Sequence, residues 1–262
     1  MFLLILIDKG GKMPEIIAFI SPKGGCGATF ACAGIWYSLA KQGKRVLAVD
    51  LCGRRCALDF ALGLQNDSIY NVYDAVNGVC DFNAALCASS LGENACFLRG
   101  DTQACETDTD ELKALLNKSD FEYVLIDLPY DENAQTDMKI ADKVILVTDC
   151  TNVSVRMCDA FAGKLEWEKV FVVINKIIPE YIENKILPTV DEIADGIGVR
   201  PIGLLPWSPS AVASFNCGVE NGIADKNLAD AFSNTAVRIT GGKSAAIDFN
   251  TYYDCFKIKK RR

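Results

Sequence analysis

Short, continuous apolar runs recur along the chain, with amphipathic segments between them. The runs are strand-sized, rich in Val and Ile and free of polar alternation, which is typical of strands buried on both faces of a parallel sheet. They cover residues 16–20, 46–49, 124–126, 144–147, 170–174 and 202–205. Helical patterns lie between them, at residues 29–41, 112–117, 154–165, 190–197 and 224–239. This alternation predicts an α/β fold, a doubly wound and mostly parallel sheet with helices on both faces.

The domain organisation predicted from the sequence is simple, because no repeat and no Pro/Gly/Ser-rich linker interrupts the alternation. We expect one domain over residues 13–242, followed by an aromatic and basic tail at residues 243–262. Residues 1–12 form an N-terminal extension, which a translation start at Met13 would remove. Its apolar opening is cut short by Asp8 and Lys9, and is too brief for a signal peptide or a membrane span.

Composition narrows the functional classes. The chain carries 27 Lys+Arg against 34 Asp+Glu, a net charge of −7, so we predict no specific nucleic-acid partner. It contains no histidine, which excludes Ser-His-Asp and Cys-His catalysis and every His-ligated zinc site. The twelve cysteines are expected to be cytosolic thiols, since a chain this long and apolar needs no disulfide staples. We therefore expect a cytoplasmic protein.

A glycine-rich loop carries the first sign of chemistry. Residues 21–29 read Ser-Pro-Lys-Gly-Gly-Cys-Gly-Ala-Thr, and they join the first predicted strand to the first predicted helix. Glycines there let backbone N–H groups turn towards phosphate oxygens, and the helix start adds positive charge. Thr29 falls where a hydroxyl would hold Mg²⁺, but the usual P-loop lysine is replaced by Ala28. A plain glycine turn between strand and helix is the alternative that this motif alone leaves open.

The Lys-Gly-Gly-x-Gly-x-Thr pattern resembles the deviant Walker A motif of the MinD/ParA family, and MinD in particular. The likeness continues, in the family's order, over roughly residues 14–240. Residues 123–129, Tyr-Val-Leu-Ile-Asp-Leu-Pro, resemble the Walker B strand. Further likenesses lie at residues 50–63, 71–80, 153–156 (Val-Ser-Val-Arg), 173–176 (Val-Ile-Asn-Lys) and 203–206 (Gly-Leu-Leu-Pro). The resemblance implies a MinD-like P-loop NTPase fold.

The resemblance also implies ATP and Mg²⁺ as cofactors, held at defined positions. Asn175 would meet the adenine, Pro206 would border it, and Lys23 would reach the phosphates of a partner in an ATP-bound homodimer. The implied nucleotide-binding residues are Lys23, Gly24, Gly25, Cys26, Gly27, Ala28, Thr29, Asn175 and Pro206. The implied Mg²⁺ ligands, some acting through water, are Thr29, Asp50 and Asp127.

Three chemical positions depart from the family pattern. Ala28 replaces the P-loop lysine, Cys52 replaces the acid that orients the attacking water, and Tyr130-Asp131 stands where a glycine follows Asp-x-Pro. Losing the lysine removes a charge-assisted contact of roughly 1.5–3 kcal/mol. Cys52 replaces a carboxylate as proton acceptor only when it is a thiolate. We therefore expect weakened ATP binding, and hydrolysis that is weak or lost.

Two cationic residues and three thiols suggest further interpretations. Arg54 and Arg55 are candidate surrogate cations for the phosphates, although a solvated surface pair is the favoured alternative. Cys26, Cys52 and Cys150 each end a predicted strand at the edge where ligands collect, so convergence on a metal is conceivable. No Cys-x-x-Cys pair occurs, and buried filler is the favoured interpretation.

The C-terminal tail combines an aromatic stripe with a basic end. Phe249, Tyr252, Tyr253 and Phe256 stand at helical spacing, and Lys257 begins the basic end. An aromatic face beside cations suits a helix lying on an anionic membrane surface, and MinD proteins carry a short amphipathic C-terminal helix with that role. A helix docked on the core with a solvated basic end is the equal alternative.

Together with these motifs, the resemblance implies a MinD-like ATP-binding switch protein that serves division-site placement. We expect a nucleotide-dependent dimer, cell-division regulator proteins as partners, and peripheral attachment to the inner face of the cell membrane. One alternative is a pseudo-ATPase scaffold of the kind that positions pilus machinery. A weaker alternative is a metal-cluster carrier ATPase.

Overall fold

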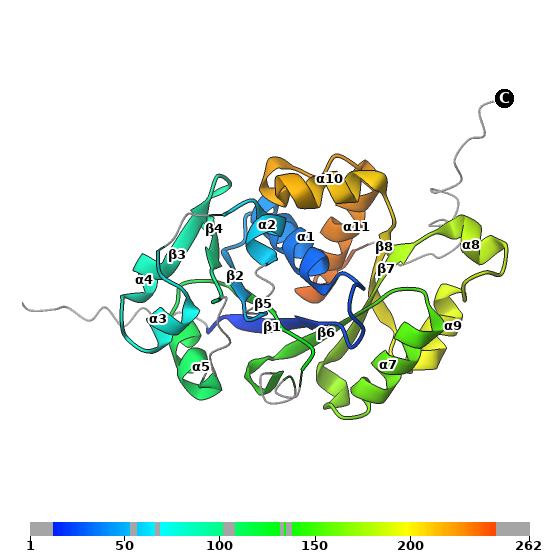
Figure 1. Ribbon diagram of the computed structural model, residues 1–262, viewed down its shortest axis with the longest axis horizontal. Coiled ribbons are helices and arrows are strands. Elements are labelled where there is room, and N and C mark those ends of the chain that lie inside the picture. Colours follow the sequence, from blue (N-terminus) through cyan, green and yellow to red (C-terminus); the bar gives the residue numbers. More distant parts are fainter. Residues whose placement is uncertain are drawn as a thin grey trace, which may run out of the picture.

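The computed structural model describes residues 13–52, 57–65, 69–101, 108–131, 134 and 138–244. An eight-stranded sheet with the order β3-β4-β2-β5-β1-β6-β7-β8 lies between two layers of helices (Figure 1). The strands are β1 (Glu15–Ile20), β2 (Val46–Asp50), β3 (Leu86–Ser89), β4 (Gly92–Leu98), β5 (Tyr123–Asp127), β6 (Lys143–Thr148), β7 (Val170–Ile177) and β8 (Pro201–Pro206). The predicted fold class is confirmed.

The helices divide between the two faces of the sheet. One layer holds α1 (Ala28–Lys41), α2 (Leu58–Leu62), α10 (Pro209–Cys217) and α11 (Lys226–Ile239), and the other holds α5 (Thr109–Asn117), α7 (Asn152–Ala162) and α9 (Val190–Ile197) (Figure 1). Shorter helices are α3 (Val72–Val76), α4 (Phe82–Ala85) and α8 (Pro179–Glu183), with 3-10 turns at Met138–Ile140, Trp167–Lys169 and Val219–Asn221.

Each central strand feeds two hydrophobic cores, because successive side chains of a strand point to opposite faces. On β1, Ile17 and Phe19 pack into the core under α1 and α11. Ile16, Ala18 and Ile20 pack into the core on the other face. This double burial explains why the predicted strands lack polar alternation, and every one of them lies within an observed parallel strand.

The hairpin of β3 and β4 was not predicted from the sequence. β3 runs antiparallel to β4, while β4 runs parallel to β2. The first three residues of β4, Gly92, Glu93 and Asn94, are exposed and only the last four are buried. β3 is short and alternates in burial, so neither strand shows the continuous apolar run that marks the others.

Helix α1 is fixed by close packing against α11. Gly34 lies against the ring of Phe232, and a Cβ atom at Gly34 would overlap that ring. On the sheet side, the buried Trp36 donates from Nε1 to the Cys96 carbonyl at 3.1 Å. These contacts set where the first turn of α1, which follows the glycine-rich loop, sits above the sheet.

The ends of the chain fall largely outside the described residues. This holds for the predicted extension at residues 1–12 and for all but two residues of the predicted tail at residues 243–262, so both boundaries stay predictions. Within the described part, no helix combines the length and the apolarity that crossing a bilayer requires.

The α1–α11 contact predicts the effect of one added methyl group. Gly34→Ala should lower the free energy of unfolding by about 1–3 kcal/mol, because overpacking against Phe232 outweighs the better helix propensity of alanine. Gly163→Ala is the matched control, since Gly163 has a helical φ of −62° and its nearest atom to a new Cβ is 3.7 Å away. Urea unfolding should show the control unchanged or slightly stabilised. A Gly34→Ala protein as stable as the wild type would contradict the packing described.

Candidate functional site

A pocket of about 370 Å³ opens at the carboxyl ends of the parallel strands, beside the start of α1. Ligands collect at this edge in open α/β sheets. The pocket gathers the predicted nucleotide-binding residues from the loop after β1, the end of β7 and the end of β8. Those residues are Lys23, Gly24, Gly25, Cys26, Gly27, Ala28, Thr29, Asn175 and Pro206. The structure thus places them together, while their roles stay predictions.

The backbone of the glycine-rich loop adopts conformations that favour glycine. Gly25 and Gly27 have φ of 82° and 94°, in the left-handed region. A Cβ atom at Gly27 would also overlap the side chain of Asn175. α1 begins directly afterwards at Ala28, with no side-chain cap at Gly27 and no acidic residue in its first turn. The positive end of the helix therefore faces the pocket without a protein anion of its own in that turn, as an anion site requires.

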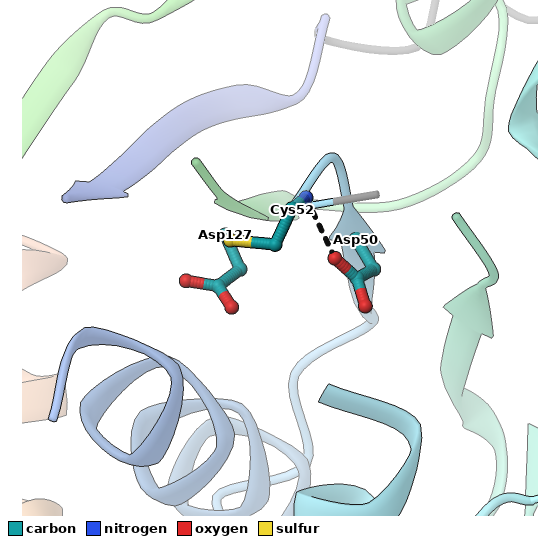
Figure 2. A group of neighbouring side chains, drawn as sticks. All are labelled: Asp50, Cys52 and Asp127. Atoms are coloured by element: carbon teal, nitrogen blue, oxygen red, sulfur yellow. Dashed lines mark hydrogen bonds between the residues drawn. The ribbon is translucent and has the colours of Figure 1, made fainter. Parts of the chain in front are cut away.

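Two buried carboxylates stand beside this helix start. Asp50 and Asp127 end the adjacent strands β2 and β5 in direct register, and each is 1% exposed. Thr29 donates from Oγ1 to Oδ2 of Asp127 at 2.6 Å, while the backbone N–H of Cys52 donates to Oδ1 of Asp50 at 2.8 Å. Figure 2 shows Asp50, Cys52 and Asp127 close together. One ligand atom of each lies within 4.8 Å of those of the other two.

This donor set fits Mg²⁺, which prefers hard oxygen ligands and keeps several waters. The Thr29 hydroxyl and the Asp127 carboxylate are the direct candidates, and Asp50 is placed to act through water. Cys52 adds a thiol in the position where the family pattern has an acid. The oxygen ligands needed to hold the metal are therefore present, while the acid expected to orient water is not.

Burial also changes the acidity of Asp50. Loss of solvent raises the pKa of this carboxyl from 3.8 to about 6, against the opposing hydrogen bond from the Cys52 amide. Asp59 adds a like charge that raises the pKa further. A nearby cation would stabilise the charged form of this buried carboxyl group, because it offsets the cost of burying the charge.

Lys23 is held by a carboxylate of its own chain. Its Nζ lies 2.6 Å from Oδ2 of Asp149, which follows β6. Burial alone would raise the pKa of Asp149, but hydrogen bonds from Lys23 and Thr151 outweigh it and the pKa lies below its usual range. The predicted contact of Lys23 with a partner's phosphates therefore requires exchanging Asp149 for a phosphate.

Two side chains at the end of β7 bind the glycine-rich loop from the side. Asn175 is buried and donates from Nδ2 to the Cys26 carbonyl at 2.8 Å. Lys176 donates from Nζ to the Gly25 carbonyl at 2.6 Å. Asn175 was predicted from the resemblance, whereas Lys176 lay within the similar segment at residues 173–176 but had no predicted role.

An aromatic wall was also missed from the sequence. Phe30, Trp207 and Phe215 line the pocket next to the loop. The rings of Phe30 and Phe215 lie 5.8 Å apart, and Trp207 is about half exposed. Such an apolar surface beside a polar loop suits a flat base next to a phosphate chain. Two of these aromatic residues directly follow predicted nucleotide-binding residues in the sequence, Phe30 after Thr29 and Trp207 after Pro206. That proximity was the signal that could have identified the wall.

The three candidate cysteines do not converge in the structure. Cys26 Sγ meets Ser154 Oγ at 3.1 Å, Cys150 Sγ donates towards the Asn175 carbonyl at 4.0 Å, and Cys52 lies with the two carboxylates. Among the residues that the structure describes, the one group of metal-ligating side chains is Asp50, Cys52 and Asp127. The interpretation in which these three cysteines converge on a metal is therefore wrong.

The remaining predicted residues divide between this pocket and the part of the chain that the structure does not describe. Ala28, Cys52 and Tyr130, which depart from the family pattern, all line the pocket. Arg54 and Arg55 lie outside the described residues, as does the whole predicted membrane stripe with Lys257, so both interpretations stay predictions.

This chain is similar in sequence and in structure to known nucleotide-binding proteins of one family. The model for the CobQ/CobB/MinD/ParA nucleotide binding domain matches residues 17–218. The septum site-determining protein MinD of Bacillus subtilis (strain 168) is 30% identical over 241 residues, covering 87% of this chain and 90% of that protein. The MinC:MinD cell division protein complex of Aquifex aeolicus matches with a TM-score of 0.80 at 29% identity, covering 88% of this chain and 97% of that one.

A further solved structure supports the fold alone. MinD of Pyrococcus horikoshii OT3, complexed with Mg-ADP, matches with a TM-score of 0.74 at 23% identity. It covers 87% of this chain and 96% of that one.

The raised pKa of Asp50 predicts a pH dependence of stability in magnesium-free buffer. Between pH 4 and 6 the folded protein holds the Asp50 proton more tightly than the unfolded chain, so the contribution of Asp50 to stability falls as pH rises. The unfolding free energy of the wild type minus that of Asp50→Asn should therefore drop by about 2 kcal/mol from pH 4 to pH 7. Urea unfolding of both proteins measures this difference. A value that is equal at the two pH values would contradict the burial argument.

Proposed function

Since the chain belongs to the CobQ/CobB/MinD/ParA nucleotide-binding family, we propose that it is a MinD-like ATP-binding switch protein that takes part in placing the division site. The proposal is supported by the division-site names of the relatives and by the pocket in this chain. The protein would change state according to whether Mg-ATP is bound.

One observation carries the nucleotide part of the proposal. The glycine-rich loop and the uncapped start of α1 lie next to Thr29 and Asp127, which are joined by a 2.6 Å hydrogen bond. Backbone amides would bind phosphate oxygens there, and the hydroxyl and carboxylate would hold Mg²⁺, which would neutralise phosphate charge. None of these groups depends on the lysine that the loop has lost.

Two residues of the same pocket favour slow ATP hydrolysis. Ala28 offers no cation to the developing phosphate charge, and Cys52 offers a thiol where a carboxylate would accept a proton from water. Binding and release of ATP, rather than turnover, would then set the state of the protein. This pair of changes equally favours the pseudo-ATPase scaffold, which would bind ATP and recruit partners without hydrolysis.

The proposal includes two protein partners. A second copy of the chain would face the first across the bound ATP, with Lys23 leaving Asp149 for the opposite phosphates. A division regulator would be the other partner, as the MinC:MinD complex of Aquifex aeolicus suggests. A homodimer of this kind would carry two C-terminal tails, which would strengthen membrane attachment through avidity.

Restoring the lost side chains tests the switch mechanism. Ala28→Lys should raise the affinity for Mg-ATP roughly tenfold to a hundredfold, because it returns a charge-assisted contact. Adding Cys52→Asp should raise turnover by roughly a hundredfold or more. Calorimetry and phosphate release measure the two effects. The mechanism would be contradicted by a wild-type protein that already hydrolyses ATP as fast as the double variant.

The membrane part of the proposal rests on the tail and has its own test. Wild-type protein with Mg-ATP should sediment with vesicles rich in anionic lipid, and adding salt should release it. A variant with Ser at residues 249, 252, 253 and 256 should stay in the supernatant while still binding ATP. Equal sedimentation of both proteins would instead favour the tail docked on the core.

A further inference from the structure

Two consecutive residues of β7 contact consecutive carbonyls of the glycine-rich loop. Asn175 donates to the Cys26 carbonyl and Lys176 donates to the Gly25 carbonyl, at 2.8 Å and 2.6 Å. In a regular strand two neighbouring side chains would point to opposite faces of the sheet. A local irregularity must therefore direct the lysine towards the loop.

That irregularity is a β-bulge in β7. Between Ile174 and Ile177, β7 advances three residues while the paired segment of β8, from Leu204 to Pro206, advances two. Lys176 has φ of 57°, a left-handed conformation that is uncommon for residues other than glycine, and its N–H donates to Oδ1 of Asn175 at 2.8 Å. Bulges of this kind are frequent beside functional sites, where they redirect a side chain.

The charges around the pocket give this redirected lysine a distinct position. Among the described residues that line the pocket, the cations are Lys23 and Lys176 and the carboxylate is Asp127. Lys23 is already bound to the Asp149 carboxylate, whereas the Lys176 ammonium donates to a neutral group, the Gly25 carbonyl. A phosphate oxygen is a stronger partner for an ammonium than a carbonyl is, because the hydrogen bond is charge-assisted on both sides.

We propose that Lys176 is the phosphate-binding cation of this pocket and supplies from β7 the charge that Ala28 no longer supplies from the loop. The inference rests on the proposed function, since its ligand is the polyphosphate chain of a bound nucleotide. Without ligand the ammonium rests on the Gly25 carbonyl. With ligand it turns to a phosphate oxygen, since a side chain of four carbons that carries three donors can change partner.

The test separates charge from backbone effects with three variants. Lys176→Met removes the charge and keeps the length, Lys176→Arg keeps the charge, and Lys185→Met is the matched control. Lys185 is an exposed lysine with nearly the same φ, 58°, but it lies after α8 and does not line this pocket. Thermal unfolding without ligand would show that each variant folds, and Lys176→Gln would replace Lys176→Met if the latter did not.

Calorimetry with Mg-ATP, sodium tripolyphosphate and adenosine gives the readout. Lys176→Met should weaken Mg-ATP and tripolyphosphate binding roughly tenfold to a hundredfold and leave adenosine binding nearly unchanged. It should also reduce the salt dependence of ATP binding, because one exposed charge interaction is lost. Lys176→Arg and Lys185→Met should stay close to the wild type.

Each contrary outcome has a different meaning. Unchanged ATP affinity in Lys176→Met would overturn the inference and leave the proposed function intact. Equal losses of affinity for ATP and for adenosine in Lys176→Met would also overturn the inference, because the lysine would then serve only to hold the bulge. If the wild type bound neither Mg-ATP nor tripolyphosphate at millimolar levels, the proposed function itself would fail.

Discussion

The start of α1 is the constraint on which the rest of the site depends. Backbone amides can attract a phosphate only if the chain holds them at a fixed angle and no side chain of the protein caps them. Gly27, in the left-handed conformation, makes the turn from loop to helix, and Gly34 lets α11 pack close enough to fix the helix. Asn175 braces the loop from β7. The proposed phosphate binding at this site would therefore depend first on main-chain geometry.

Most of the fold was predictable because its strands are buried on both faces. Such strands are continuous apolar runs, and their alternation with helices leaves few topologies. The β3–β4 hairpin was missed because it lies at the edge of the sheet, where exposed residues such as Glu93 and Asn94 replace the apolar signal. Helix α10 was missed because its pattern is weakly amphipathic and one residue, Ser214, is buried.

The site was predictable only where it is local in sequence or carried by a family motif. The glycine-rich loop is a contiguous segment, so its geometry follows from its glycines. Cys26, Cys52 and Cys150 were placed at one sheet edge, but the strand order inserts β5 between β2 and β1 and so separates Cys52 from Cys26. Asp127 of β5 takes the place beside Cys52 instead. Lys176 was not foreseen because a bulge, which leaves no mark in the sequence pattern, directs it.

We propose that main-chain amides at the start of α1 bind a triphosphate even though the loop has lost its lysine. Backbone NMR of the wild-type protein during a titration with Mg-ATP tests this most directly. The account predicts that the amide resonances of residues 24–29 shift strongly and saturably, and that adenosine shifts them much less. Unchanged resonances for these residues at millimolar Mg-ATP would contradict it.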